Sequence, residues 1–107
     1  MIMLTPDNFS ETVLTTKSDK LTVVQFTASW CSSCRDVVPI IDRLKEIYPD
    51  VIFCKVDVDQ SPSLADQHEI DKLPTFLFYK NRKITNFLIG NESITRFKTI
   101  ISDALKS

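Results

Sequence analysis

A chain of 107 residues with 43% hydrophobic and 25% charged residues has the composition of one globular domain, and we expect a single domain over residues 1–107. The formal net charge of -1 leaves no basic field that would attract nucleic acid or an anionic membrane. The apolar runs fall far short of the roughly 18 residues of a membrane helix, and the N-terminus lacks the basic and apolar regions of a secretory signal, so a cytoplasmic location is expected.

The first half of the chain begins with a helical pattern and continues into a strand pattern. Thr5 is a good capping residue and Pro6 is tolerated at the first helical position, so we expect a helix from here to about Lys17. Residues 21–28 form an apolar run without alternation, which predicts a central strand buried on both faces. Residues 1–4 allow a further short strand.

A second helical pattern directly follows this strand and the two cysteines after it. Its apolar residues recur at spacings of four and three, as on one face of an amphipathic helix: Val37, Ile41, Leu44 and Tyr48. Pro39 stands inside the pattern and is expected to kink the helix. Residues 51–58 predict a second buried strand, and Ser61 before Pro62 opens another short helix.

The last third of the chain predicts a β-hairpin and a closing helix. Residues 75–79 and 84–89 read as strands, separated by a polar turn. Asn91 or Ser93 is expected to cap the last helix. The apolar face of this helix is formed by Ile94, Phe97, Ile101 and Leu105. Alternating strands and helices require a parallel sheet covered by helices, so we expect an α/β fold: a three-layer α/β/α sandwich with a mixed central sheet of four or five strands.

Two of the three cysteines, Cys31 and Cys34, are separated by two residues at the predicted start of a helix. At this spacing their sulfurs can close a small disulfide ring or stand open as two thiols. Unpaired N–H groups and the helix dipole stabilise an anion there, so the pKa of Cys31 is expected to fall from about 8.5 to about 7 or below. We expect Cys31 to be exposed and to attack a target disulfide, and Cys34 to be shielded and to resolve the mixed disulfide.

Half of a zinc site is the competing interpretation of this cysteine pair, with Cys54 and His68 as the remaining candidate ligands. It is disfavoured, because Cys54 lies mid-strand and is expected to be a small buried hydrophobe, whereas His68 is expected to be a solvated helix residue. A purely structural disulfide is disfavoured because so short a loop constrains little of the unfolded chain. We therefore expect no metal.

Gly90 is the only glycine in the chain. This excludes a glycine-rich phosphate loop for NAD, flavin or ATP. Electrons must then come from another protein or a small thiol, and we expect no cofactor other than the redox-active Cys31–Cys34 disulfide.

Several further features occur in a fixed order along the chain. They are the segment Trp30-Cys31-Ser32-Ser33-Cys34, the proline at position 39, the strand at residues 51–59, the segment Leu73-Pro74-Thr75-Phe76, and the glycine at position 90. Together they resemble the thioredoxin family over essentially the whole chain. The family's motif reads Trp-Cys-Gly-Pro-Cys, and its other hallmarks include a kinking proline, a cis-proline segment before a strand, and a glycine after the last strand.

The resemblance implies a thioredoxin fold and a thiol–disulfide oxidoreductase that reduces protein disulfides. It implies a monomer that is recharged by a thioredoxin reductase or a similar electron donor. A cis bond before Pro74 would present the backbone of Leu73 beside the disulfide, where a substrate strand can pair. The apolar docking face implied around it is formed by Trp30, Val58, Leu73, Pro74, Ile89 and Gly90.

Two departures from the family pattern stand out. Gln25 occupies the place of a buried aspartate, which in the family is thought to accept the proton of the deeper cysteine, and Lys55 loses the expected acidic partner. Ser32 and Ser33 replace the Gly-Pro pair, and their hydroxyls are expected to bond the Cys31 thiolate, to cap the helix, or both.

Two alternative functions stay open at this point. Loss of the buried acid favours a disulfide oxidase or isomerase, although no sign of an oxidising compartment is present. The same feature favours a binding module that uses the docking face while its thiols turn over slowly. The intact pair of Cys31 and Cys34 argues against the binding module, because pure binding needs neither thiol.

Overall fold

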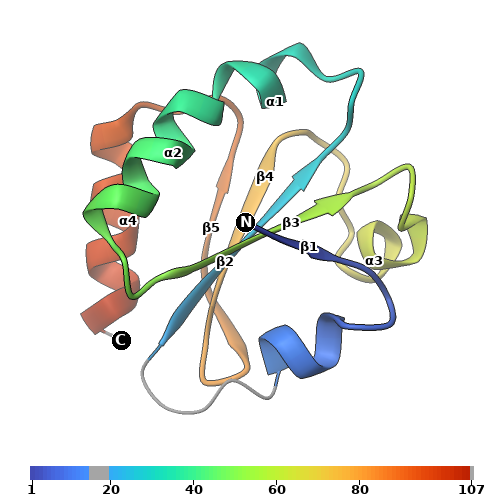
Figure 1. The fold of residues 1–107 in the computed structure, drawn as a ribbon, viewed down its shortest axis with the longest axis horizontal. Coiled ribbons are helices and arrows are strands. Elements are labelled where there is room, and N and C mark those ends of the chain that lie inside the picture. The colour runs from blue at the N-terminus through green and yellow to red at the C-terminus, as the bar shows by residue number, and fades with distance from the viewer. Residues whose placement is uncertain (15–19, 107) are drawn as a thin grey trace.

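The computed structural model describes residues 1–14 and 20–106. Within these ranges a mixed sheet lies between two layers of helical segments (Figure 1). In chain order the elements are β1 (Ile2–Leu4), the π-helical turn η1 (Ser10–Leu14), β2 (Leu21–Thr27), α1 (Ser32–Asp36), α2 (Val38–Ile47), β3 (Ile52–Asp57), α3 (Pro62–Gln67), β4 (Thr75–Lys80), β5 (Lys83–Ile89) and α4 (Ile94–Lys106).

The sheet has five strands in the order β1-β3-β2-β4-β5. Strands β1, β3 and β2 are parallel, whereas β4 runs antiparallel to β2 and β5 antiparallel to β4. Strand β2 is therefore the central strand, and every one of its residues except Thr27 is buried. The expected α/β sandwich with a mixed sheet is confirmed, and the short strand β1 brings the sheet to five strands.

Each face of the sheet has its own hydrophobic core. Helices α2 and α4 cover one face, where the rings of Phe76 and Phe97 meet edge to face with centroids 4.8 Å apart. The turn η1 and helix α3 cover the other face, where Val13 and Leu64 pack with Phe26 of the central strand. Because both faces are covered, the apolar run of β2 needs no alternation.

The helix after the two cysteines is interrupted rather than merely kinked. Helix α1 ends at Asp36 and α2 begins at Val38, with Val37 between them. Pro39 is the cause, because proline has no N–H to donate to the carbonyl four residues earlier. Cys34 therefore lies on a short helix of its own, and Cys31 directly precedes the first residue of this helix.

The first helix begins later than the sequence predicts. The Oγ1 of Thr5 does accept a hydrogen bond from the backbone N–H of Asp7 at 3.2 Å, but this bond closes a turn, and the helical turn η1 begins only at Ser10. The predicted continuation to Lys17 lies outside the described residues.

The predicted ends of the other elements hold with small corrections. Helix α3 begins at Pro62, although the side chain of Ser61 makes no capping bond to it. Ser93 is the residue whose hydroxyl accepts the N–H of Arg96, at 3.2 Å, before α4. Leu105 was expected on the buried face of this helix and is 42% exposed. The buried face of α4 is formed by Phe97, Ile100, Ile101 and Ala104.

Candidate active site

Cys31 and Cys34 lie just beyond the end of the central strand and are joined as a disulfide, with their Cα atoms 5.3 Å apart. Cys31 is the residue that caps helix α1, and its Sγ accepts a hydrogen bond from the backbone N–H of Cys34 at 3.2 Å. The sulfur thus occupies the place that a capping oxygen takes in most helices. A donor aimed at Sγ stabilises a thiolate, so the predicted position at a helix start is confirmed.

The expected difference in exposure between the two cysteines is wrong. Cys31 is 6% exposed and Cys34 is 3% exposed, so both are buried in the disulfide form. The reason is tertiary packing, because the pair forms a small apolar cluster with Ala28, against which Val58 and Leu73 pack from two other loops. The two cysteines differ instead in what they face, since only Cys34 lines the cavity described below.

The two serines of the motif have different surroundings. The Oγ of Ser33 lies 3.7 Å from the Sγ of Cys31, within reach of a weak hydrogen bond to sulfur. Ser32 is exposed, and its hydroxyl makes no hydrogen bond with the residues that the structure describes. The idea that these serines cap the helix is wrong, because Cys31 occupies the capping position.

Trp30 is the most exposed large apolar residue of the described chain, at 66%. Its indole N–H donates a hydrogen bond to Oδ2 of Asp59 at 2.8 Å, which fixes the ring beside the disulfide. Asp59 was not among the predicted site residues. Its position two residues after the end of a parallel strand was the available signal, because such strand ends lie at the same sheet edge as the cysteines.

The segment around Pro74 forms the next part of this surface. The peptide bond between Leu73 and Pro74 is cis, as expected. The backbone N–H of Gly90 donates to the carbonyl of Pro74 at 2.8 Å, and Ile89 pairs with Thr75 across strands β4 and β5. Gly90 has a φ of 94°, a conformation that residues with a Cβ rarely adopt. The structure thus places Leu73, Pro74, Ile89 and Gly90 close together.

Burial varies across the residues expected to form the docking face. Trp30 and Ile89 are exposed, Pro74 is buried, and the others are half-buried. The half-buried residues are Val58, Leu73 and Gly90.

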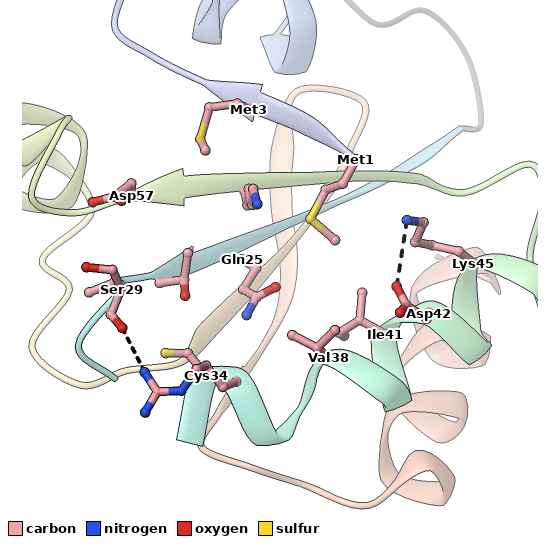
Figure 2. Close-up of a pocket in the computed structure, with 14 residues that line it drawn as sticks. Met1, Met3, Gln25, Ser29, Cys34, Val38, Ile41, Asp42, Lys45 and Asp57 are labelled. Atoms are coloured by element: carbon pink, nitrogen blue, oxygen red, sulfur yellow. Dashed lines mark hydrogen bonds and ion pairs between the residues drawn. The ribbon is translucent and has the colours of Figure 1, made fainter. Parts of the chain in front are cut away.

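A cavity of about 570 Å³ lies behind the disulfide, between the sheet and helices α1 and α2 (Figure 2). Cys34, Gln25 and Lys55 all line it. Gln25 is only 6% exposed and is the register partner of Lys55 on the neighbouring strand. The position at which the family carries an acid therefore does share a cavity with the deeper cysteine.

Cys54 and His68 are far from forming a metal site with this pair. Cys54 is buried in the other core, and burial raises its pKa to about 11, so it behaves as the predicted small hydrophobe. In residues 1–14 and 20–106 no three His, Cys, Asp or Glu side chains are grouped so that they would hold a metal ion. Nor is any helix within those ranges long and apolar enough to span a bilayer.

His68 is not the solvated residue that we expected. Its Nδ1 lies 2.7 Å from the carbonyl oxygen of Leu64, and its Nε2 lies 2.8 Å from the hydroxyl of Tyr79. The imidazole also contacts the rings of Phe9 and Phe26, at centroid distances of 5.2 and 5.3 Å. His68 is therefore a structural residue that ties the end of α3 to strand β4.

Comparison with known proteins adds to this geometry. The family model described as Thioredoxin matches residues 1–103. Thioredoxin from Ictalurus punctatus is 42% identical over 94 residues, which cover 85% of this chain and 88% of that protein. The X-ray structure of Fasciola hepatica thioredoxin superposes with a TM-score of 0.88 at 31% identity and covers 97% of this chain and 99% of its own.

A third similar chain comes from a solved structure concerned with the thiol-resolving mechanism in yeast mitochondrial 1-Cys peroxiredoxin via glutathione/thioredoxin systems. It has a TM-score of 0.86 at 31% identity and covers 96% of this chain and 94% of its own. The disulfide-bonded cysteine pair at a helix start and the similarity to thioredoxins therefore point to the same chemistry, thiol–disulfide exchange. The chain belongs to the thioredoxin family and is a thiol–disulfide oxidoreductase that reduces protein disulfides.

Proposed function

We propose that Cys31 is the attacking nucleophile and Cys34 the resolving cysteine. The observation that carries this assignment is the hydrogen bond from the Cys34 N–H to the Sγ of Cys31 at the helix cap, because it favours the thiolate on Cys31. Cys31 sulfur attacks one sulfur of the target disulfide, and the other target sulfur leaves as a thiolate. Cys34 then attacks Cys31 sulfur, its proton leaves to solvent, and the second target sulfur is released.

The target is proposed to dock on the apolar face around the disulfide. A strand of the target pairs with the backbone at Leu73, next to cis Pro74, while Trp30 and Ile89 offer exposed apolar surface on either side. The packing of Val58 and Leu73 against the cysteine cluster supports this arrangement, because a strand bound there reaches the buried sulfur of Cys31.

Membership of the thioredoxin family implies disulfide-containing protein substrates and a reductase as partners. We further propose that a thioredoxin reductase or a similar protein supplies the electrons. The chain is proposed to work as a single-domain monomer in the cytoplasm, in electron transport and cell redox homeostasis. It uses no cofactor or metal beyond Cys31–Cys34 and binds neither nucleic acid nor membrane. Peroxiredoxins are a suitable substrate class, since a structural relative concerns one of them.

The test uses two single substitutions, one at each cysteine of the pair, and a third cysteine substitution as the control. Cys31→Ser is expected to abolish insulin-disulfide reduction, and Cys34→Ser to trap targets as mixed disulfides that a reductant releases. Cys54→Ser is the control and leaves reduction unchanged, since this thiol lies in the opposite core. Trapping by the Cys31 variant instead would reverse the assigned roles. Failure of the wild type to reduce insulin would favour a binding module, and an oxidising reduction potential would favour an oxidase or isomerase.

A further inference from the structure

The floor of the cavity behind the disulfide is a row of side chains that crosses three strands. Met3 of β1 is the register partner of Lys55 on β3, and Lys55 is the register partner of Gln25 on β2. Side chains at paired positions lie on the same face of a sheet, so these three lie next to one another. Cys34 and Val38 line the opposite wall, from helices α1 and α2.

Gln25 presents an unpartnered amide to this cavity. The residue is 6% exposed, yet its side chain makes no hydrogen bond with any residue in the described ranges. Figure 2 shows its amide directed away from the sheet, toward the helical wall that carries Cys34 and Val38. Burying an amide without a hydrogen bond costs free energy, and a ligand that forms hydrogen bonds with the amide recovers this cost.

Lys55 is the unpaired cation on the floor of the cavity. It is half-buried and forms no ion pair or hydrogen bond with the part of the chain that the structure describes. The other charged side chains of the lining are engaged: Lys45 lies 3.9 Å from Asp42, Arg35 donates to a backbone carbonyl at 2.7 Å, and Asp57 accepts two backbone N–H groups. The free polar side chains of the floor therefore offer one ammonium and one amide, and the N-terminal ammonium of Met1 adds a second positive charge to the lining.

The remaining wall of the cavity is apolar and continues to its mouth. Met1 and Met3 on one side and Val38 on the other are 46%, 40% and 49% exposed, although all three are large apolar residues. The volume of about 570 Å³ falls within the range of about 300–1,000 Å³ typical of sites for small molecules. A cavity with a cationic floor and an apolar mouth fits a ligand that has an anionic head group and a short apolar tail.

We propose that this cavity binds a small aliphatic monocarboxylate. The carboxylate accepts hydrogen bonds from the ammonium of Lys55 and the amide NH₂ of Gln25, and the alkyl tail packs between Met1, Met3 and Val38. One carboxylate serves both Lys55 and Gln25, whereas a second negative charge would share the cavity with the carboxylates of Asp42 and Asp57. The site goes beyond the redox function, because the ligand exchanges no electrons with the cysteines.

The test is a titration of the oxidised protein, so it does not depend on turnover. Acetate, butanoate and hexanoate are added at constant pH and ionic strength while backbone amide NMR signals are followed, with chloride as the reference salt. We expect saturable shifts at Gln25, Lys55 and Val38. The dissociation constant is expected to fall roughly two- to fourfold for each added methylene that enters the apolar part. Non-saturable shifts, or shifts spread over the surface, would overturn the proposal.

A matched pair of lysine variants locates the charge. Lys55→Met keeps the length of the side chain and removes the ammonium, and we expect hexanoate to bind at least about tenfold more weakly. Lys45→Met is the control: it removes another lysine of the same lining that already has a partner, so binding is expected to stay within about twofold. Equal effects of the two variants would refute a site at Lys55.

A third variant tests the site without changing Lys55. Gln25→Asp places an internal carboxylate beside the ammonium and is expected to abolish hexanoate binding by taking the place of the ligand's head group. Undiminished binding in this variant would overturn the proposal. Because all three measurements use the disulfide form, failure of the proposed redox roles and failure of this site give separate results.

Discussion

The third thiol, Cys54, allows a quantitative test of the environment inside the sheet. It lies on strand β3, is 1% exposed, and has Ile2 and Val24 as register partners on its two sides. A double variant, Cys31→Ser with Cys34→Ser, leaves Cys54 as the only thiol, so any alkylation reports on this position alone.

Burial disfavours the thiolate and raises the pKa of Cys54 from 9.0 to about 11, while the positive charge of the N-terminus opposes part of the shift. At any pH below 9, two units of pKa correspond to about a hundredfold smaller thiolate fraction than in an ordinary thiol. Because only the thiolate reacts, alkylation of the folded protein at pH 8 is expected to be at least about a hundredfold slower than in the unfolded chain.

The measurement is the rate of iodoacetamide labelling, followed by mass spectrometry in buffer and in concentrated urea. The folded-state rate is expected to rise about tenfold per pH unit until the pH nears 11. The raised pKa also predicts how stability depends on pH. Its contribution to the free energy of unfolding is fully present below pH 9 and is lost as the pH rises toward 11. Folded and unfolded rates within tenfold of each other at pH 8 would refute the buried, inert thiol.

Three further substitutions test other parts of the structure. Gln25→Asp is expected to raise the pKa of Cys31 through the added negative charge and to speed resolution near pH 7, measured by thiolate absorbance and stopped flow; no change in either would show that position 25 does not reach the sulfurs. Gly90→Ala is expected to cost about 1–2 kcal/mol in urea unfolding because of the positive φ, since an added Cβ meets no atom within 4 Å; an unchanged midpoint would contradict this. Tyr79→Phe removes the hydroxyl bonded to His68 and is expected to lower the free energy of unfolding by about 0.5–1.5 kcal/mol without altering insulin reduction; a loss of reduction at full stability would give His68 a role that we do not assign.

The elements of the fold could be predicted because their signals are local. The apolar run of the central strand, the proline at position 39 and the cysteine pair at a helix start each depend on residues close in sequence. The exposure of Leu105 was missed, since it depends on how helix α4 lies against the sheet. An apolar pattern in the sequence identifies the apolar face of a helix, but it does not show which residues of that face lie at the centre of the contact with the sheet.

The site was predictable only as far as its motif. Burial of Cys31 could not be read from its neighbours in sequence, because Val58 and Leu73 reach it from other loops. His68 was mistaken for a solvated residue for the same reason: its partner Tyr79 lies eleven residues away and is brought close only by the packing of α3 on the sheet. Polar side chains with distant partners leave no periodic signal.

The turn between β4 and β5 has a practical consequence for handling the protein. Asn81 and Arg82 both have positive φ, and the two strands that meet there run away from Pro74 and return to Gly90. Six residues of strand put the turn about 20 Å from the docking face, at the opposite end of the sheet (Figure 1). A fluorophore, a biotin or a tether to an electrode attached at the turn would leave the surface around the disulfide uncovered, which suits this chain to an immobilised sensor of disulfides.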